Sequence, residues 1–117
     1  MGYASKKNMR GFASQLRGQL YRTVAATFTV DGWTAADGKY TQRKSVVNSG
    51  AFTIKNVHPP LTTQTGNAAT DATKRRNLGT IARNLAEFSV TAEQITVKVT
   101  TDTKPDCDLD VVWYLEV

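Results

Sequence analysis

The sequence predicts an α+β protein with a mainly antiparallel, sandwich-like β-sheet, one packed amphipathic helix and a basic helix or arm at the amino end. Two kinds of periodicity lead to this class. Apolar and polar residues alternate along several stretches, which is typical of strands with one buried face. Along two other stretches, apolar residues recur every three to four positions, as in amphipathic helices. The predicted order is a helix, three strands, a loop, a helix and two strands.

The composition is that of an ordinary globular protein. Hydrophobic residues make up 40% of the 117 residues and charged residues 21%, so we expect one domain over residues 21–117, preceded by an arm over residues 1–20. A single cysteine excludes an internal disulfide and a multi-cysteine metal cluster. No stretch resembles a membrane-spanning helix or a signal peptide, and we expect synthesis in a reducing cytosol.

Residues 1–20 are predicted to be a basic amphipathic helix or arm. Its large apolar side chains are spaced by three and four positions and share one helical stripe: Met9, Phe12, Leu16 and Leu20. Its basic side chains lie elsewhere around the helix: Lys6, Lys7, Arg10 and Arg17. Gly11 and Gly18 each weaken a helix by about 1 kcal/mol relative to Ala. The segment therefore either docks on its own domain as a helix or becomes ordered only against a partner. A basic amphipathic helix can also lie on a membrane, but we predict no membrane partner.

Three strands are predicted next. Apolar and Thr side chains alternate over residues 21–30. The strand at 40–47 is less regular, and the strand at 51–57 is stopped by Pro59 and Pro60, which have no N–H to donate. A polar loop is predicted over 61–73.

A second amphipathic helix is predicted from an N-cap at Thr70 or Asp71 to about Glu87. Its apolar stripe has the spacing of a helix and consists of Leu78, Ile81, Ala82, Leu85 and Phe88.

Two strands close the chain, at residues 94–100 and 109–117. Their strict alternation predicts an antiparallel hairpin, interrupted at Pro105, with the second helix packed on its apolar face. The core predicted from all of these elements consists of Phe28, Ile54, Ile81, Leu85, Ile95, Val97, Val111 and Trp113.

Charge is unevenly distributed along the chain, whose net charge is +5. Residues 1–60 carry nine Lys and Arg against two Asp, whereas residues 61–117 carry six against eight acids. Asp106, Asp108 and Asp110 alternate near the carboxyl end. Such polarity suits a nucleic acid, an acidic protein surface or head-to-tail contact between copies, in which this acidic segment meets the basic arm of a neighbour.

No catalytic, cofactor or metal site is predicted, and we do not expect an enzyme. His58, the only histidine, precedes two prolines and lacks an evident nucleophile and orienting group. Cys107 lies between two aspartates, which raise the pKa of a thiol and so oppose its activation. The three alternating aspartates lack the glycine and the glutamate of a calcium loop.

A nucleic-acid partner is the alternative reading. Lys74, Arg75 and Arg76 on the second helix, together with the basic arm, provide positive charge. Aromatic residues are sparse near these charges, however, and no zinc-finger, RNA-binding or phosphate-loop motif is present.

Taken as a whole, the chain resembles the small structural proteins of bacteriophage virions. The features that carry the resemblance are the basic, glycine-containing arm, the Thr-rich strand at 23–30, the polar loop at 61–73, a single packed helix around Ile81 and a closing hairpin that reaches Val117. The resemblance implies a capsid, decoration or tail component made in the host bacterial cytoplasm and located in the virion. Its expected partners are other copies of itself, with a trimer as one arrangement, and other virion proteins. It implies no catalytic residues.

Overall fold

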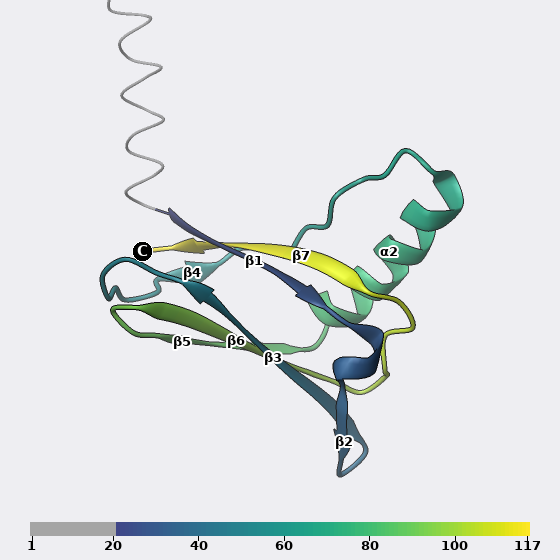
Figure 1. Cartoon of the computed structure of the whole chain (residues 1–117), viewed down its shortest axis with the longest axis horizontal. Helices are drawn as coiled ribbons and strands as arrows, with labels where there is room; N and C mark the ends of the chain where they lie inside the picture. Colours follow the sequence, from purple (N-terminus) through teal and green to yellow (C-terminus); the bar gives the residue numbers. More distant parts are fainter. Residues whose placement is uncertain (1–20) are drawn as a thin grey trace, which may run out of the picture.

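Two antiparallel sheets face each other in the structure, a computed structural model that describes residues 21–117 (Figure 1). Sheet A has the strand order β1-β7-β4, with β1 at Tyr21–Phe28, β7 at Leu109–Glu116 and β4 at Asn56–Val57. Sheet B has the order β2-β3-β6-β5, with β2 at Thr34–Ala36, β3 at Lys39–Val47, β6 at Gln94–Thr101 and β5 at Leu85–Val90. The helix α2 spans Ala68–Ala82, and a 3-10 turn, η1, spans Val30–Gly32. The predicted α+β, sandwich-like class is confirmed. The arm at 1–20 lies outside the described residues.

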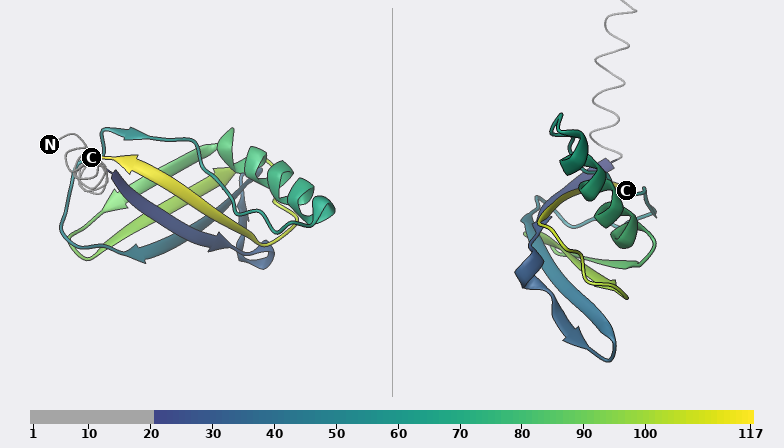
Figure 2. Two further views of the ribbon diagram at one scale, coloured as in Figure 1. Left: turned by 90° about the horizontal axis from the view of Figure 1, so that it is seen from above. Right: turned by 90° about the vertical axis from the view of Figure 1, so that its right-hand side faces the viewer.

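The two sheets approach each other differently along their two sides. On one side β1 of sheet A contacts β3 of sheet B. On the other side the edge strands are β4 and β5 (Figure 2). An edge strand has backbone groups that no further strand of its sheet satisfies. The side formed by β4 and β5 is called the open side below.

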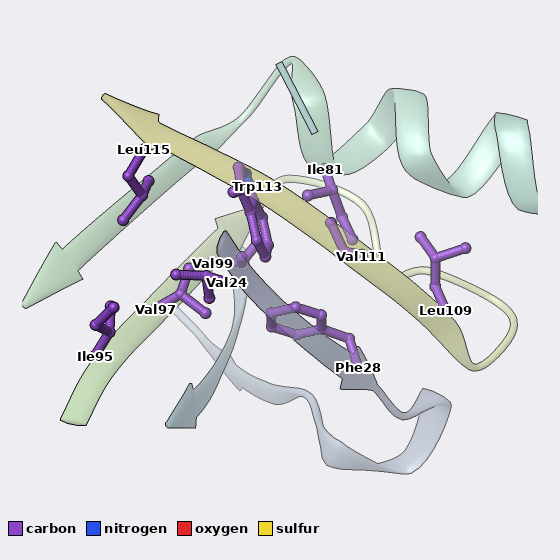
Figure 3. Packing of buried hydrophobic residues seen from close by; sticks show 10 residues of the cluster. All are labelled: Val24, Phe28, Ile81, Ile95, Val97, Val99, Leu109, Val111, Trp113 and Leu115. Atoms are coloured by element: carbon purple, nitrogen blue, oxygen red, sulfur yellow. The ribbon is translucent and has the colours of Figure 1, made fainter. Parts of the chain in front are cut away.

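The core fills the space between the sheets, because alternate residues of each strand point inward. The fully buried apolar side chains come from β1, α2, β6 and β7 (Figure 3), and they are Val24, Phe28, Ile81, Ile95, Val97, Val99, Leu109, Val111, Trp113 and Leu115. Trp113 is central: its ring meets Phe28 at 5.8 Å and Phe88 at 5.6 Å, both edge-on. Burial of each large side chain contributes about 1.5–3 kcal/mol. Six of the eight predicted core residues are therefore confirmed as buried. Ile54 is half-buried against the core, and Leu85 is 57% exposed, so its prediction is wrong.

The predicted closing hairpin is wrong, although both of its strands exist. β6 pairs with β3 and β5 in sheet B, whereas β7 pairs with β1 and β4 in sheet A. Residues 102–108 cross between the sheets and are tied to other elements: Asp106 bonds Asn77 of α2, and Asp108 bonds the N–H of Val30. Alternation identifies the buried face of a strand but not its neighbour. The apolar faces of β6 and β7 meet across the core instead of lying side by side.

The second helix begins and ends earlier than predicted. Its N-cap is Asn67, whose side chain accepts a hydrogen bond of 2.9 Å from the N–H of Thr70. It ends at Ala82, and Leu85 and Phe88 belong to β5, a strand that the sequence did not predict. Ala86, Phe88 and Val90 are the half-buried alternate residues of that strand. The helical spacing from Leu78 to Phe88 therefore spans two different elements. Ile81 and Leu78 still pack on the core, as predicted for the helix.

The remaining strand predictions are met to different degrees. The strand at 21–30 is confirmed as β1, which ends at Phe28, and the strand at 40–47 is confirmed as β3. Of the segment 51–57, only β4 is a strand, while Phe52 and Ile54 pack against the core without a ladder. β2 was not predicted. Within residues 21–117, no helix is long and apolar enough to cross a membrane.

Candidate functional site

Each aspartate of the predicted acidic segment has a partner within its own chain. Asp106 accepts hydrogen bonds of 2.8 Å from Arg76 Nη2 and from Asn77 Nδ2. These bonds, that of Asn77 first, hold the pKa of Asp106 below its usual value. Asp108 Oδ1 accepts a 2.8 Å bond from the N–H of Val30. All three aspartates are therefore bonded within their own chain, although Asp106 and Asp108 stay exposed.

Asp110 forms the strongest polar contact of this region. Its Oδ1 lies 2.8 Å from Nζ of Lys74, a buried ammonium that also donates to the carbonyl and hydroxyl oxygens of Thr63. The N–H and hydroxyl of Thr63 in turn donate to Asp110 Oδ2 at 3.0 and 2.8 Å. Burial alone raises the pKa of Asp110, but the bonds from Lys74 and Thr63 outweigh it and lower that pKa. The contact fastens the polar loop to both α2 and β7.

A second carboxylate fixes the same loop from its other end. Asp71, in the first turn of α2, accepts bonds of 2.8 Å from the N–H and hydroxyl of Thr65 and one of 3.1 Å from the N–H of Gly66. The bond from the N–H of Thr65 is the largest of the influences that lower the pKa of Asp71. The predicted surface loop is thus ordered by two aspartates.

The basic run on α2 is mostly neutralised. Lys74 binds Asp110 and Arg76 binds Asp106, while Arg75 is exposed. Sheet B carries a further row of basic residues that the sequence does not predict. Lys98 of β6 stands opposite Arg43 of β3, and on its other side it faces Glu87 of β5. A hollow of about 410 Å³ beside this row is also lined by Lys44. Arg43 and Lys98 become neighbours only through the register of β3 and β6, which their separate positions in the sequence do not indicate.

Cys107 lies beside Asn77 of α2, and His58 lies at the end of β4. Burial, followed by the charge of Asp106, raises the pKa of the Cys107 thiol. His58 directly follows β4, as expected of a residue at a strand end. Its Nε2 is 3.8 Å from Glu116 Oε2, and within residues 21–117 it has no hydrogen-bond partner although the atom itself is buried. In the part of the chain that the structure describes, no three His, Cys, Asp or Glu side chains gather as metal ligands.

The open side of the sandwich holds a mostly apolar cleft. Its volume is about 380 Å³. The residues that enclose it come from β4 and the segment after it, from the end of α2, from β5 and from β7, and they include Val57, His58, Pro60, Leu85, Ala86 and Trp113. Two of the large apolar side chains that the molecule exposes, Val57 and Leu85, are at its rim. We refer to this feature as the open-side cleft.

The amino-acid sequence does not predict this cleft. The sequence predicts Leu85 on a helix, and it indicates Val57 only as the end of a strand. The cleft depends on the distance between two sheets, which local periodicity does not report. The predicted arm residues, Lys6 to Arg17, lie outside the described chain, so the structure does not relate them to it.

No protein family, no curated protein and no solved structure matches this chain. The residues themselves therefore carry the functional proposal.

Proposed function

We propose that this protein is a bacteriophage virion structural component, of capsid-decoration or tail type, that works by assembling with copies of itself and with other virion proteins. The virion and its host are proposed on the resemblance of the sequence. Assembly is supported by one structural observation: the open side combines two edge strands with an apolar cleft whose rim is exposed. Unprotected edge strands and large apolar patches both favour association with another chain.

The apolar surface extends beyond the cleft along sheet A. Leu61 is 55% exposed and forms an isolated antiparallel bridge with Val112 of β7, and Tyr114 on the same strand is 40% exposed. A partner that covers this surface would remove apolar area from water at about 25 cal/mol per Å². Asp106 and Asp108 remain exposed, but their internal bonds make them weaker contact points than the open side.

The test is the mass of the full-length protein in solution, measured by analytical ultracentrifugation, against that of a chain lacking residues 1–20. We expect the full-length protein to form a multi-chain species and the shortened protein to be a monomer with an unchanged thermal unfolding midpoint. A full-length protein that stays monomeric at every concentration would contradict the proposal. A shortened protein that still assembles would leave assembly in place and remove the arm from it.

A small nucleic-acid-binding protein is the second candidate, favoured by the row of Arg43 and Lys98 together with the basic arm. Retention on an immobilised nucleic acid distinguishes the two functions. For the second candidate, affinity falls by orders of magnitude between ~50 and ~200 mM salt, because neutralised phosphates release counterions. Under the assembly proposal we expect weak retention, and loss of Glu87 opposite Lys98 (Glu87→Gln) should change it little.

A further inference from the structure

We infer that the open-side cleft receives the apolar stripe of residues 1–20 from a neighbouring copy of this chain. The inference rests on the proposed function, since it names the surface through which the copies assemble. The stripe consists of Met9, Phe12, Leu16 and Leu20.

The cleft has the chemistry of a receptor for large apolar side chains. Its floor includes Trp113 and Ile81, both core residues, and its rim includes Leu85 and Val57. No Lys, Arg, Asp or Glu is among the residues that line it. An apolar side chain that enters a cleft of about 380 Å³ would extend the core outward without leaving a charge buried.

The described chain begins next to a residue of the cleft. Tyr21, the first residue of β1, pairs with Glu116, and its ring lies 5.5 Å from the ring of His58, which lines the cleft. Twenty residues of chain precede Tyr21, and as a helix they would reach about 30 Å.

Charge complements the apolar fit. The segment 1–20 has four basic residues and no acid. Two carboxylates contact residues of the cleft wall: Glu116 lies 3.8 Å from His58, and Asp102 accepts a 3.4 Å bond from Asn84. Arg83 adjoins the cleft in sequence but does not line it. Basic side chains around the stripe would meet these two carboxylates at the rim.

The direction of β1 favours a neighbour over the same chain. Tyr21 is level with Glu116, the last residue of β7, so β1 runs from that end of sheet A toward Phe28. Trp113 lies on β7 opposite Val24, three residues further along β1 than Tyr21, and Ala86 lies on β5 of the other sheet. A segment would have to reverse at Tyr21 and pass around β4 to fill the cleft of its own chain. A neighbour's segment needs no such reversal.

Disulfide trapping tests the contact directly in the full-length protein. In a Cys107→Ser background, one chain carries Ala13→Cys beside the stripe and a second chain carries Ala82→Cys, an exposed residue of the cleft wall. We expect mild oxidation of the mixture to give cross-linked heterodimers. Ala72→Cys, exposed on the same helix but not among the lining residues, is the matched control, and it should cross-link several-fold less.

Equal cross-linking through Ala72→Cys and Ala82→Cys, or none through Ala82→Cys, would overturn the inference. A single chain that carries both Ala13→Cys and Ala82→Cys tests docking within one copy. Its closure into a compact cross-linked monomer at high dilution would also overturn the assignment to a neighbour.

A blocking variant separates failure of the inference from failure of the proposed function. Ala82→Arg places a bulky cation at the cleft, which obstructs the stripe and repels the basic arm, while Ala72→Arg is its control. We expect Ala82→Arg alone to convert the assembly to monomers of unchanged thermal stability. If both variants assemble like the wild type, the cleft is not the receptor but the assembly function stands. If the wild type itself is monomeric, both fail.

Discussion

Gln42 shows how one polar side chain joins the two sheets. It is buried in β3, and its amide makes two bonds of 3.0 Å with the backbone of Thr29, donating to the carbonyl and accepting from the N–H. Thr29 follows the last residue of β1, where the ladder with β7 has ended. The amide thus satisfies backbone groups that no strand reaches. Gly32 leaves room for it, because a Cβ at Gly32 would lie 2.8 Å from the Gln42 side chain.

Replacing Gln42 by Ala is expected to lower the free energy of unfolding by about 1–3 kcal/mol, since the Thr29 N–H would lose its partner and the Thr29 carbonyl would keep only the N–H of Gly32. Urea denaturation measures the change. Gln94→Ala, at an exposed position of β6, is the control and should be within about 0.5 kcal/mol of the wild type. Equal effects at Gln42 and Gln94 would show that the two hydrogen bonds between Gln42 and Thr29 do not stabilise the fold.

Of the carboxylates that bind the polar loop, Asp110 is the one whose loss should lower the stability of the fold most. Asp110→Asn removes the charge that faces Lys74. Because the Asp110 side chain is 35% exposed, solvent screening limits the expected loss of stability at neutral pH to about 1–2 kcal/mol. Asp37→Asn, in the exposed turn between β2 and β3, is the control, since Asn tolerates the left-handed conformation at this position (φ 54°).

The effect of Asp110→Asn should also depend on pH. The folded pKa of Asp110 lies below its unfolded value, so its contribution is fully present above the unfolded pKa of about 4. It is lost as pH falls through the lower folded pKa. Denaturant titrations at a series of pH values should therefore show the variant and the wild type converging below pH ~4. A difference that stays constant down to the lowest pH would mean that the Asp110 charge does not stabilise the fold.

At the scale of elements, the sequence predicted the buried faces of β6 and β7 correctly, but it did not predict how the strands pair. The alternation in β6 and β7 correctly identified Ile95, Val97, Val111 and Trp113 as core. It could not show that these strands belong to different sheets, because pairing depends on contacts that are distant in the sequence. β5 was missed for another reason: Leu85 and Phe88 continue the helical spacing of Ile81, and the break after Ala82 has no Gly or Pro to mark it. The open-side cleft depends on both of these unpredicted features.

Trp113 and Leu85 should respond to truncation in opposite ways. Trp113→Ala removes a ring that is 1% exposed and contacts Phe28 and Phe88, and it should cost about 3–5 kcal/mol of stability. Leu85→Ala should change stability by no more than about 0.5 kcal/mol, because the side chain is largely exposed, yet it should weaken assembly. Thermal unfolding and ultracentrifugation report the two effects. Val47→Ala, exposed at 93% and outside the cleft lining, should affect neither.

At the scale of the whole molecule, charge is concentrated in the segment that precedes the domain. Of the 15 basic residues, four lie in residues 1–20, whereas all ten acids lie in the domain. The domain is therefore close to neutral, and two domains do not repel each other strongly. Association between them can depend on apolar contact, with the basic segment adding attraction at the rim of the cleft.

Salt should separate these two contributions. Raising ionic strength to ~1 M shortens the Debye length to about 3 Å and removes most of the attraction between the arm and the two rim carboxylates. The apolar contact is not screened, so we expect the dissociation constant of the assembly, measured by ultracentrifugation, to rise by no more than about tenfold. Complete dissociation into monomers at high salt would show that charge, and not the apolar stripe, holds the copies together.

The position of β7 has a consequence for the order of events during synthesis. β7 is the middle strand of sheet A and the last described strand to leave the ribosome, whereas its partner β1 is the first. At typical translation rates of about 5–20 residues per second, β1 waits several seconds for it. Until then Val24 and Phe28 have no strand paired with them, and the floor of the cleft lacks Trp113, which has not yet been made. A growing chain therefore lacks the complete cleft that would bind a neighbour's segment, and each copy must fold before it can join an assembly.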